Sequence, residues 1–321
     1  MLVDGDDVLA AKLIWPGAPN PGSTVKAQLT SKPSGSRRGI ARLDDGTEIQ
    51  LDRIGREKTE GAAIWVEITR APVAERGRLK RALGRVRDTR AVEETLERGG
   101  QLNTDGFCYP LPFAEDFRQL PRGETFDGRW DEVWQTANGG QIEFDGGSVL
   151  VSTTPAMTLI DVDGHLSPRE LPLAAIPAIR RALLWFDIGG NIGIDFPTIE
   201  AKKDRKAVDE ALGSALDDWP HERTAMNGFG FVQLIARLEG PSLLHRFATS
   251  RTGMCARYAL RVAERAEGTG PVLLLRIHPA LKAKLKPEWI DELRRRTGRE
   301  VRIETEGGLA LEAPQAQIVQ A

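Results

Sequence analysis

Three aspartates stand at the ends of two apolar runs, in positions that could support metal chemistry. Asp161 and Asp163 close the run TLIDVD, and Asp195 closes NIGID. Open α/β sheets bind ligands outside the carboxyl ends of their strands, so such residues can meet at one site. Proteins hold Mg²⁺ through one or two carboxylates together with waters and substrate phosphates. The pattern therefore indicates metal-assisted phosphodiester chemistry, although a strand-end aspartate also serves as a turn or helix-cap residue in many proteins.

A calcium loop is the rival interpretation of the same residues. The segment DVDGHLSPREL matches the second half of an EF-hand loop, with Gly164 at position six and Glu170 at position twelve. Leu159 stands where the first aspartate ligand is required, and the preceding residues are strand-like where an EF-hand has a helix. The sequence therefore favours the strand-end site.

The other reactive side chains form no known catalytic or metal-binding spacing. The cysteines, Cys108 and Cys255, lie far apart, which argues against a disulfide framework and a structural zinc knuckle. GGNIG at 189–193 precedes a strand and lacks the Lys-Ser/Thr ending of a phosphate loop. The histidines lack the spacing of a zinc protease; they are His165, His221, His245 and His278.

The elements around these aspartates predict a layered α/β domain over residues 141–248. QIEF and SVLVSTT flank an Asp-Gly turn, and TLIDVDG is a third strand. The helix LAAIPAIRRALLWF leads to the strand NIGIDF, and the helix KKDRKAVDEALGSALDDW precedes the apolar run FGFVQLIARL. The order β-β-β-α-β-α-β is that of a layered α/β domain.

The N-terminal part predicts a small β-barrel of the OB type over residues 1–90. Short apolar runs alternate there with DG and PG turn signals. The stretch 76–90 holds seven basic residues and one acid, with Leu79, Leu83 and Val86 at helical spacing. We expect a helix that is either an ordinary solvated surface or a basic strip that follows phosphates.

The remaining segments predict a connector and a small C-terminal unit. Residues 91–140 are acidic and irregular in pattern. Residues 249–321 predict a small α/β unit with the helix MCARYALRVAERAEG, the strand PVLLLRIHP, the helix KPEWIDELRRRTG and the strand REVRIET. We expect the final EAPQAQIVQA to be frayed. The chain is thus expected to be a mixed α/β multidomain protein.

The overall charge limits which partners can be attracted at long range. Forty-four Lys and Arg face 46 Asp and Glu in a chain of 321 residues, a net charge of −2. A polyanion must therefore be met by a local patch. No apolar run approaches the ~20 residues of a membrane span, and the acidic N-terminus is unlike a signal peptide. We expect a cytoplasmic protein with no membrane partner.

Three segments taken together resemble one known family. SVLVSTTPAMTLIDVDG, FDIGGNIGIDF and FGFVQL, in this order and spacing, resemble the catalytic core of the bacterial ribonuclease E/G family over about residues 141–244. The resemblance implies a DNase I-like catalytic domain that binds Mg²⁺ through Asp161 and Asp195. It also implies that Asp163 and Asp187 orient ligands or water, and that the metal activates water for in-line attack on an RNA phosphodiester.

The same resemblance implies where single-stranded RNA is held. Lys203 and Lys206 fall where the family's catalytic helix is basic. The N-terminal barrel looks like a shortened form of the family's OB-type RNA-binding module, and ERGRLKRA resembles the basic stretch that follows it. The residues expected to contact phosphates there are Arg76, Arg78, Lys80 and Arg81.

Departures from the family pattern leave a second function open. Asp163 replaces an asparagine, Phe186 a basic residue, and Pro155 and Gln233 replace glutamates. An RNA-binding protein that kept the fold and lost efficient cleavage is therefore the alternative, while a small-molecule phosphoesterase would not need the barrel and basic strip. The family's zinc link survives only as Cys255, so any oligomer should not be zinc-linked. The acidic segment 91–140 replaces the module with which the family senses the RNA 5′ end. Cleavage should therefore not depend on the RNA 5′ end.

Overall fold

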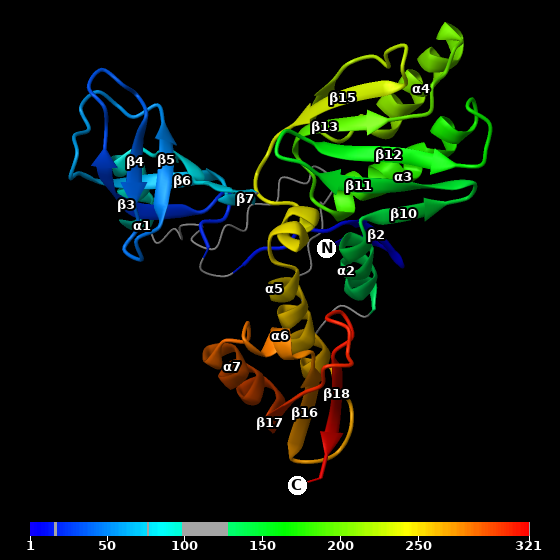
Figure 1. The fold of residues 1–321 in the computed structure, drawn as a ribbon. Coiled ribbons are helices and arrows are strands. Elements are labelled where there is room, and N and C mark those ends of the chain that lie inside the picture. Colours follow the sequence, from blue (N-terminus) through cyan, green and yellow to red (C-terminus); the bar gives the residue numbers. More distant parts are fainter. Residues whose placement is uncertain (16–17, 76, 98–127, 321) are drawn as a thin grey trace. The chain divides into compact units, whose positions relative to one another are not determined.

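The computed structural model describes residues 1–15, 18–75, 77–97 and 128–320. Most of the expected connector at 91–140 lies outside the described residues; its described ends form α1 (Thr89–Glu97) and α2 (Arg129–Gly139). Contacts divide the chain into two compact units, with the boundary between His245 and Arg246. The first unit contains a barrel and a six-stranded sheet (Figure 1).

Five strands form the expected N-terminal barrel, which closes in the order β3-β4-β5-β9-β6. Leu29, Ile49, Leu51 and Ile64 fill its interior because alternate residues of each strand point inward. β5 and β9 run parallel, and every other neighbouring pair in the barrel is antiparallel. The strands are β3 (Thr24–Ser31), β4 (Gly39–Arg42), β5 (Glu48–Asp52), β6 (Ala63–Arg70) and β9 (Ala82–Val86).

The prediction of a helix over residues 76–90 is wrong. The described part of this stretch forms β8 (Arg78–Lys80), which pairs with β7 (Val73–Glu75), and β9 of the barrel. β9 fits between β5 and β6 because Gly84 leaves room: a Cβ there would lie 2.3 Å from Val66 Cγ1. Long-range pairing with two strands therefore overrides the local helical spacing.

The second part of the first unit is a six-stranded mixed sheet in the order β10-β11-β12-β13-β15-β14. Apart from the short β14, its elements follow the expected order, and the single parallel pair is β12 with β13. The strands are β10 (Gln141–Phe144), β11 (Gly147–Thr153), β12 (Thr158–Gly164), β13 (Gly190–Asp195), β14 (His221–Arg223) and β15 (Phe231–Ala236).

Helices cover one face of this sheet and leave the other face to solvent. α3 (Leu171–Trp185) packs against β10, β11 and β12, and α4 (Lys202–Ala215) packs against α3 (Figure 1). Ile160, Ile192 and Leu234 are fully buried on the covered face. Leu150 and Ile235, at alternating positions, are 44% and 54% exposed on the other face. We call this second face the open face.

The N-terminal hairpin is tied to the helical layer of the same unit. β1 (Leu2–Asp4) pairs with β2 (Asp7–Ala10), and β2 packs against α3. The indole Nε1 of Trp185 donates a hydrogen bond of 2.6 Å to the carbonyl oxygen of Val8, and Ala11 N donates to Leu184 O. The chain's start is therefore part of the sheet's framework.

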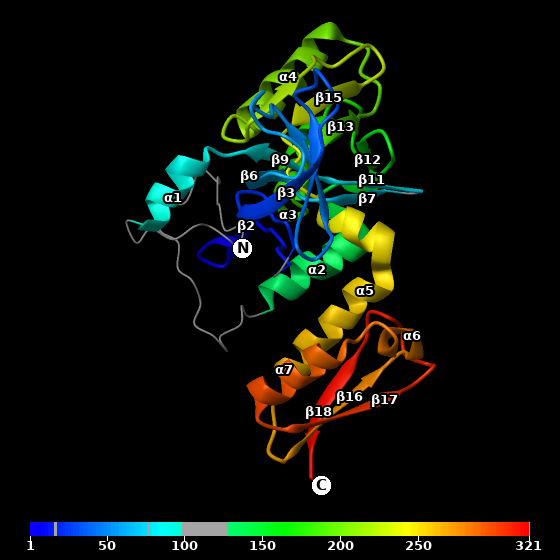
Figure 2. The same cartoon turned by 90° about the vertical axis from the view of Figure 1, so that its left-hand side faces the viewer.

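The second unit is a small α/β fold that α5 (Leu243–Glu264) enters after an irregular residue, Ser250. Its sheet has the order β17-β16-β18, and α7 packs on β17 through its buried face (Figure 2). The expectation of a frayed tail is wrong, because β18 pairs antiparallel with β16 and covers an edge that would otherwise be unpaired. The elements are β16 (Val272–Ile277), α6 (Pro279–Lys282), α7 (Pro287–Thr297), β17 (Glu300–Thr305) and β18 (Gln315–Val319).

Candidate functional site

Asp161 and Asp195 are direct partners in the parallel ladder of β12 and β13. Both are exposed on the open face, and partners in a ladder project from the same side of a sheet. Strands lie about 4.8 Å apart, so the two carboxylates are neighbours. Within the described residues, neither carboxylate accepts a hydrogen bond or forms an ion pair. The structure therefore brings together the two residues that the sequence proposed as metal ligands.

The buried side of each strand fixes this arrangement. Ile160 and Val162 flank Asp161 and point into the helical layer, so Asp161 must point outward. Ile194, fully buried beside Asp195, has the same effect on β13. A shift of the register by one residue would bury a carboxylate, at a cost of several kcal/mol, and expose isoleucines.

Asp163 extends the acidic side chains along the same face. It lies two residues beyond Asp161 on β12 and is exposed. Its Oδ1 accepts the backbone N–H of Gly164 at 2.8 Å. One oxygen of the Asp163 carboxylate is thus occupied by this local hydrogen bond. Asp163 lies beside the pair of Asp161 and Asp195 and is not a member of it.

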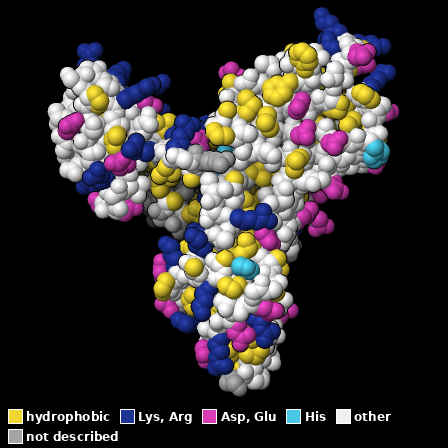
Figure 3. All heavy atoms as spheres, viewed as in Figure 1, with side chains coloured by type: hydrophobic (Ala, Val, Ile, Leu, Met, Phe, Trp, Pro, Cys, Tyr) yellow, Lys and Arg dark blue, Asp and Glu magenta, His cyan; other side chains and the backbone are white. Residues whose placement is uncertain are grey.

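An apolar strip crosses the open face next to the carboxylates. Leu150, Asp161, Asp195 and Phe231 form one row across β11, β12, β13 and β15. The ring of Phe231 lies over Gly193, where a Cβ would approach its Cζ to 2.4 Å. Figure 3 shows hydrophobic and acidic side chains together on this side of the sheet. The face therefore combines two charges with flat apolar surface.

The donor set suits a hard cation. In the described part of the chain, no group of three or more His, Cys, Asp or Glu side chains is arranged to hold a metal. Two carboxylates are enough protein ligands for Mg²⁺, which retains several water molecules in its coordination shell. Structural zinc instead needs four sulfur or nitrogen ligands. The calcium-loop alternative is excluded because β11 and β12 form a hairpin where an EF-hand requires a helix.

Asp187 lies at the opposite end of β13 from Asp195. The strand between them spans about 17 Å, so Asp187 does not join the carboxylate pair. It has a left-handed backbone, with φ 53°, and its carboxylate lies 3.8 Å from Lys12 Nζ. Lys12 also donates to Glu239 at 2.5 Å. Burial disfavours the charge on Lys12, but Asp187 and Glu239 outweigh burial and raise its pKa.

The expected phosphate contacts on α4 are exposed but only partly available. Lys206 lies 3.3 Å from Glu210, one helical turn further along. Lys203 has no ion pair among the residues that the structure describes. α4 begins shortly after Asp195, on the chain segment that follows the site.

Five cations of the basic strip share three glutamates, which reduces the positive charge of the strip. Arg78 and Lys80 both pair with Glu75. Arg81 Nε lies 2.8 Å from Glu48, whose pKa is lowered by hydrogen bonds from Arg42 and Arg81. Arg85 and Arg87 lie 3.2 and 2.9 Å from Glu67. Arg76 lies outside the described residues.

An exposed aromatic residue near the pair was missed by the sequence reasoning. Phe229 is 82% exposed at the tip of the turn that precedes β15. Asn227 Oδ1 accepts the backbone N–H groups of Phe229 and Phe231 at 2.9 and 3.1 Å, and Gly230 has φ 90°. The Asn-Gly pair in MNGFGF is a turn signal, and it implied that the first phenylalanine precedes the strand.

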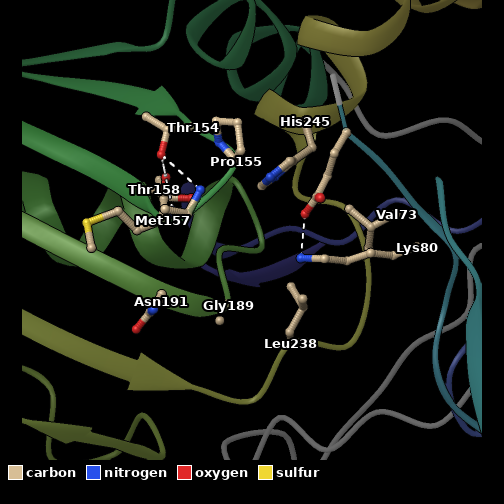
Figure 4. Close-up of a pocket in the computed structure, with 13 residues that line it drawn as sticks. Val73, Lys80, Thr154, Pro155, Met157, Thr158, Gly189, Asn191, Leu238 and His245 are labelled. Carbon is tan, nitrogen blue, oxygen red and sulfur yellow. Dashed lines mark hydrogen bonds and ion pairs between the residues drawn. The ribbon is translucent and has the colours of Figure 1, made fainter. Parts of the chain in front are cut away.

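A separate pocket of about 50 Å³ lies at the Asp187 end of β13. Glu75 and Lys80 of the β7–β8 hairpin, Asn191 and His245 line it, and Figure 4 shows Lys80 and His245 pointing into it. His245 Nδ1 lies 2.8 Å from Ser242 Oγ, and burial lowers the pKa of His245. Neither Asp161 nor Asp195 borders this pocket.

No protein-family model matches the chain. Among the residues that the structure describes, no helix is both long and apolar enough to cross a bilayer. The assignment of a function therefore depends on the open face of the sheet and on the charges of the barrel.

Proposed function

We propose that this protein is a Mg²⁺-dependent endoribonuclease that cleaves single-stranded RNA by attack of water on a phosphodiester. The observation that carries the proposal is the pairing of Asp161 with Asp195 on adjacent parallel strands, where both carboxylates are exposed. The resemblance to the ribonuclease E/G family predicts these same two ligands. A DNase I-like arrangement of the sheet and its helices is part of the proposal.

The chain's own residues supply the metal ligands and hold the substrate. Asp161 and Asp195 offer oxygen atoms only, which hard cations prefer. Mg²⁺ bound there would polarise a phosphoryl oxygen and lower the pKa of a bound water. Asp163, on the same face, would accept a hydrogen bond from a water, and Lys203 would contact a phosphate.

The barrel supports an RNA substrate. Its five closed strands, with β5 and β9 parallel, fit the OB type that the resemblance predicts, and OB-folds commonly bind single-stranded nucleic acid. The exposed ring of Phe229 offers an unpaired base a stacking surface on a fixed turn. Paired bases cannot stack on such a ring, so the proposal predicts a preference for unpaired RNA.

One observation favours the alternative of an RNA-binding protein with little cleavage. Asp187, which the resemblance gives a role at the metal, instead lies beside Lys12 at the far end of β13. Of the two residues expected to assist the metal ligands, Asp163 then remains. It carries a negative charge where the family has a neutral asparagine.

A cleavage assay separates the two functions. Purified protein is incubated with an unstructured RNA and with the same RNA annealed to its complement, in Mg²⁺ and in EDTA. We expect Mg²⁺-dependent internal cleavage of the unpaired RNA that leaves 5′-phosphates. RNA binding without cleavage at any Mg²⁺ concentration would establish the alternative.

A further inference from the structure

Two loops at one end of the barrel carry an excess of positive charge. Neighbouring strands β3, β4, β5 and β6 alternate in direction, so the β3–β4 and β5–β6 loops emerge at the same end. Residues 32–38 and 52–60 together hold six bases and three acids. Lys and Arg side chains stand out from the barrel in Figure 3.

Lys32 joins the two loops into one structure. Its ammonium group donates to the carbonyl oxygens of Gly55, Arg56 and Lys58 at 2.7, 3.2 and 2.7 Å. The N–H of Ile54 donates to the carbonyl oxygen of Arg37 at 2.7 Å. These bonds fix the backbone from which the neighbouring arginines project.

Arg53 has an unusual backbone within these loops. Its φ of 58° is left-handed, a conformation that costs free energy for a residue with a Cβ. Such residues persist where the surrounding structure holds them, and they concentrate at functional sites. An arginine at this position is therefore an observation that the fold alone does not explain.

The arginines of these loops keep their charge available. Arg37, Arg53 and Arg56 are exposed and have no ion pair within the described parts of the chain. Arg38 lies 3.2 Å from Asp52 Oδ1 but is 79% exposed, and that oxygen has no hydrogen-bond partner among the residues described. Arg38 and Asp52 are thus close in space, but no hydrogen bond joins their side chains. The basic strip differs, because five of its six described cations, all except Arg90, face Glu48, Glu67 or Glu75.

The acids of the two loops do not cancel this excess. Asp52 faces Arg38, and Glu60 accepts the N–H of Lys32 at 2.6 Å. Glu57 folds back against Gly55, where its carboxylate oxygens would lie within 2.4 Å of an added Cβ. Among the residues that the structure describes, no carboxylate pairs with Arg37, Arg53 or Arg56.

We propose that Arg37, Arg38, Arg53 and Arg56, the loop-end arginine cluster, bind the phosphates of single-stranded RNA in place of the basic strip. Guanidinium groups match phosphate oxygens with two parallel hydrogen bonds. None of the exposed large hydrophobic residues of the described chain lies in these loops, so the cluster lacks the apolar anchors of a membrane or protein interface. The choice of RNA as the polyanion rests on the proposed function.

Two charge-matched variants test the cluster. The first is Arg37→Ser, Arg53→Asn, Arg56→Ser, with asparagine chosen because it tolerates left-handed backbone. The control is Arg81→Ser, Arg85→Ser, Arg87→Ser, which removes the same charge from paired positions of the same barrel. Binding of a labelled unstructured RNA is followed by anisotropy in EDTA at several salt concentrations, so no cleavage is needed.

We expect the cluster variant to bind RNA at least tenfold more weakly and to lower the slope of log affinity against log salt by about 2, since each phosphate contact contributes about 0.7. The control should change affinity less than threefold. Replacing the same three arginines with lysine should preserve the salt slope, which separates lost charge from lost folding. Equal losses in both serine variants, or binding to anionic vesicles but not to RNA, would overturn the proposal. A cluster effect in a protein that never cleaves RNA would support the cluster while refuting the nuclease.

Discussion

The carboxylates of Asp161 and Asp195 face solvent side by side because their residues are paired in the parallel ladder of β12 and β13. Two negative charges so close together repel each other, and this repulsion does not stabilise the fold. A cation bound between them would remove it. The pair therefore has the properties of a ligand site more than those of a turn or helix cap.

Neutralising either carboxylate should abolish cleavage and spare RNA binding. In Asp161→Asn or Asp195→Asn, a neutral amide replaces a charged ligand, and the loss of several kcal/mol of metal-assisted stabilisation lowers cleavage at least 100-fold. Single-turnover cleavage and anisotropy with the same RNA measure the two effects. Glu222→Gln, on edge strand β14, is the matched control and should cleave normally. Wild-type rates in both aspartate variants would refute the assignment.

Phe229 should contribute to substrate binding more than to chemistry. Removing an aromatic ring that stacks on a base costs about 1–3 kcal/mol, so Phe229→Ala should raise KM roughly 5- to 150-fold with little change in kcat. Phe229→Trp should restore KM, and its fluorescence should be quenched by RNA but not by an abasic strand. Leu173→Ala, which removes a 40% exposed residue from α3, is the control. An unchanged KM in Phe229→Ala would exclude stacking.

The positions of the aspartates at the ends of two expected strands predicted part of the site. Asp161 and Asp195 were expected at the ends of two strands, and the ladder pairs them. The run NIGIDF was expected to be buried on both faces of a sheet, whereas Asp195 is exposed on the open face. The expectation that Asp187 lies beside these two carboxylates failed, because Asp187 precedes β13 and Asp195 ends it. The two residues therefore lie at opposite ends of that strand. The basic strip was assigned to a helix because local spacing does not reveal β5 and β6, the partners that hold β9. Ion pairs depend on residues distant in sequence, which is why the loop-end arginine cluster was not foreseen.

The purified protein should contain no stoichiometric zinc. Cys255 is buried, and burial, with the charge of Glu312 nearby, raises the pKa of its thiol to about 11. A protonated thiol is a poor ligand, and Cys255 alone, one thiol from each of two chains, cannot complete a tetrahedral site between them. Cys108 lies outside the described residues, so Cys108→Ser is tested alongside Cys255→Ser. Elemental analysis showing about half a zinc per chain that Cys255→Ser removes would contradict the prediction.

The histidine of the pocket should make the first unit less stable in mild acid. Burial lowers the pKa of His245 below its ordinary 6.5, although Glu75 raises it in part and Lys80 lowers it further. The unfolded chain therefore takes up this proton more readily than the folded one, so the stabilising contribution is complete above about pH 7 and is lost as the pH falls below 6.5. Urea unfolding at pH 7.5 and 5.5 should show a smaller acid loss in His245→Gln than in wild type, while His165→Gln, at an exposed position, should match wild type. The difference between variants isolates His245 because carboxylate titrations are common to all three proteins. An equal acid loss in His245→Gln and wild type would show that the pocket accommodates the charged imidazole.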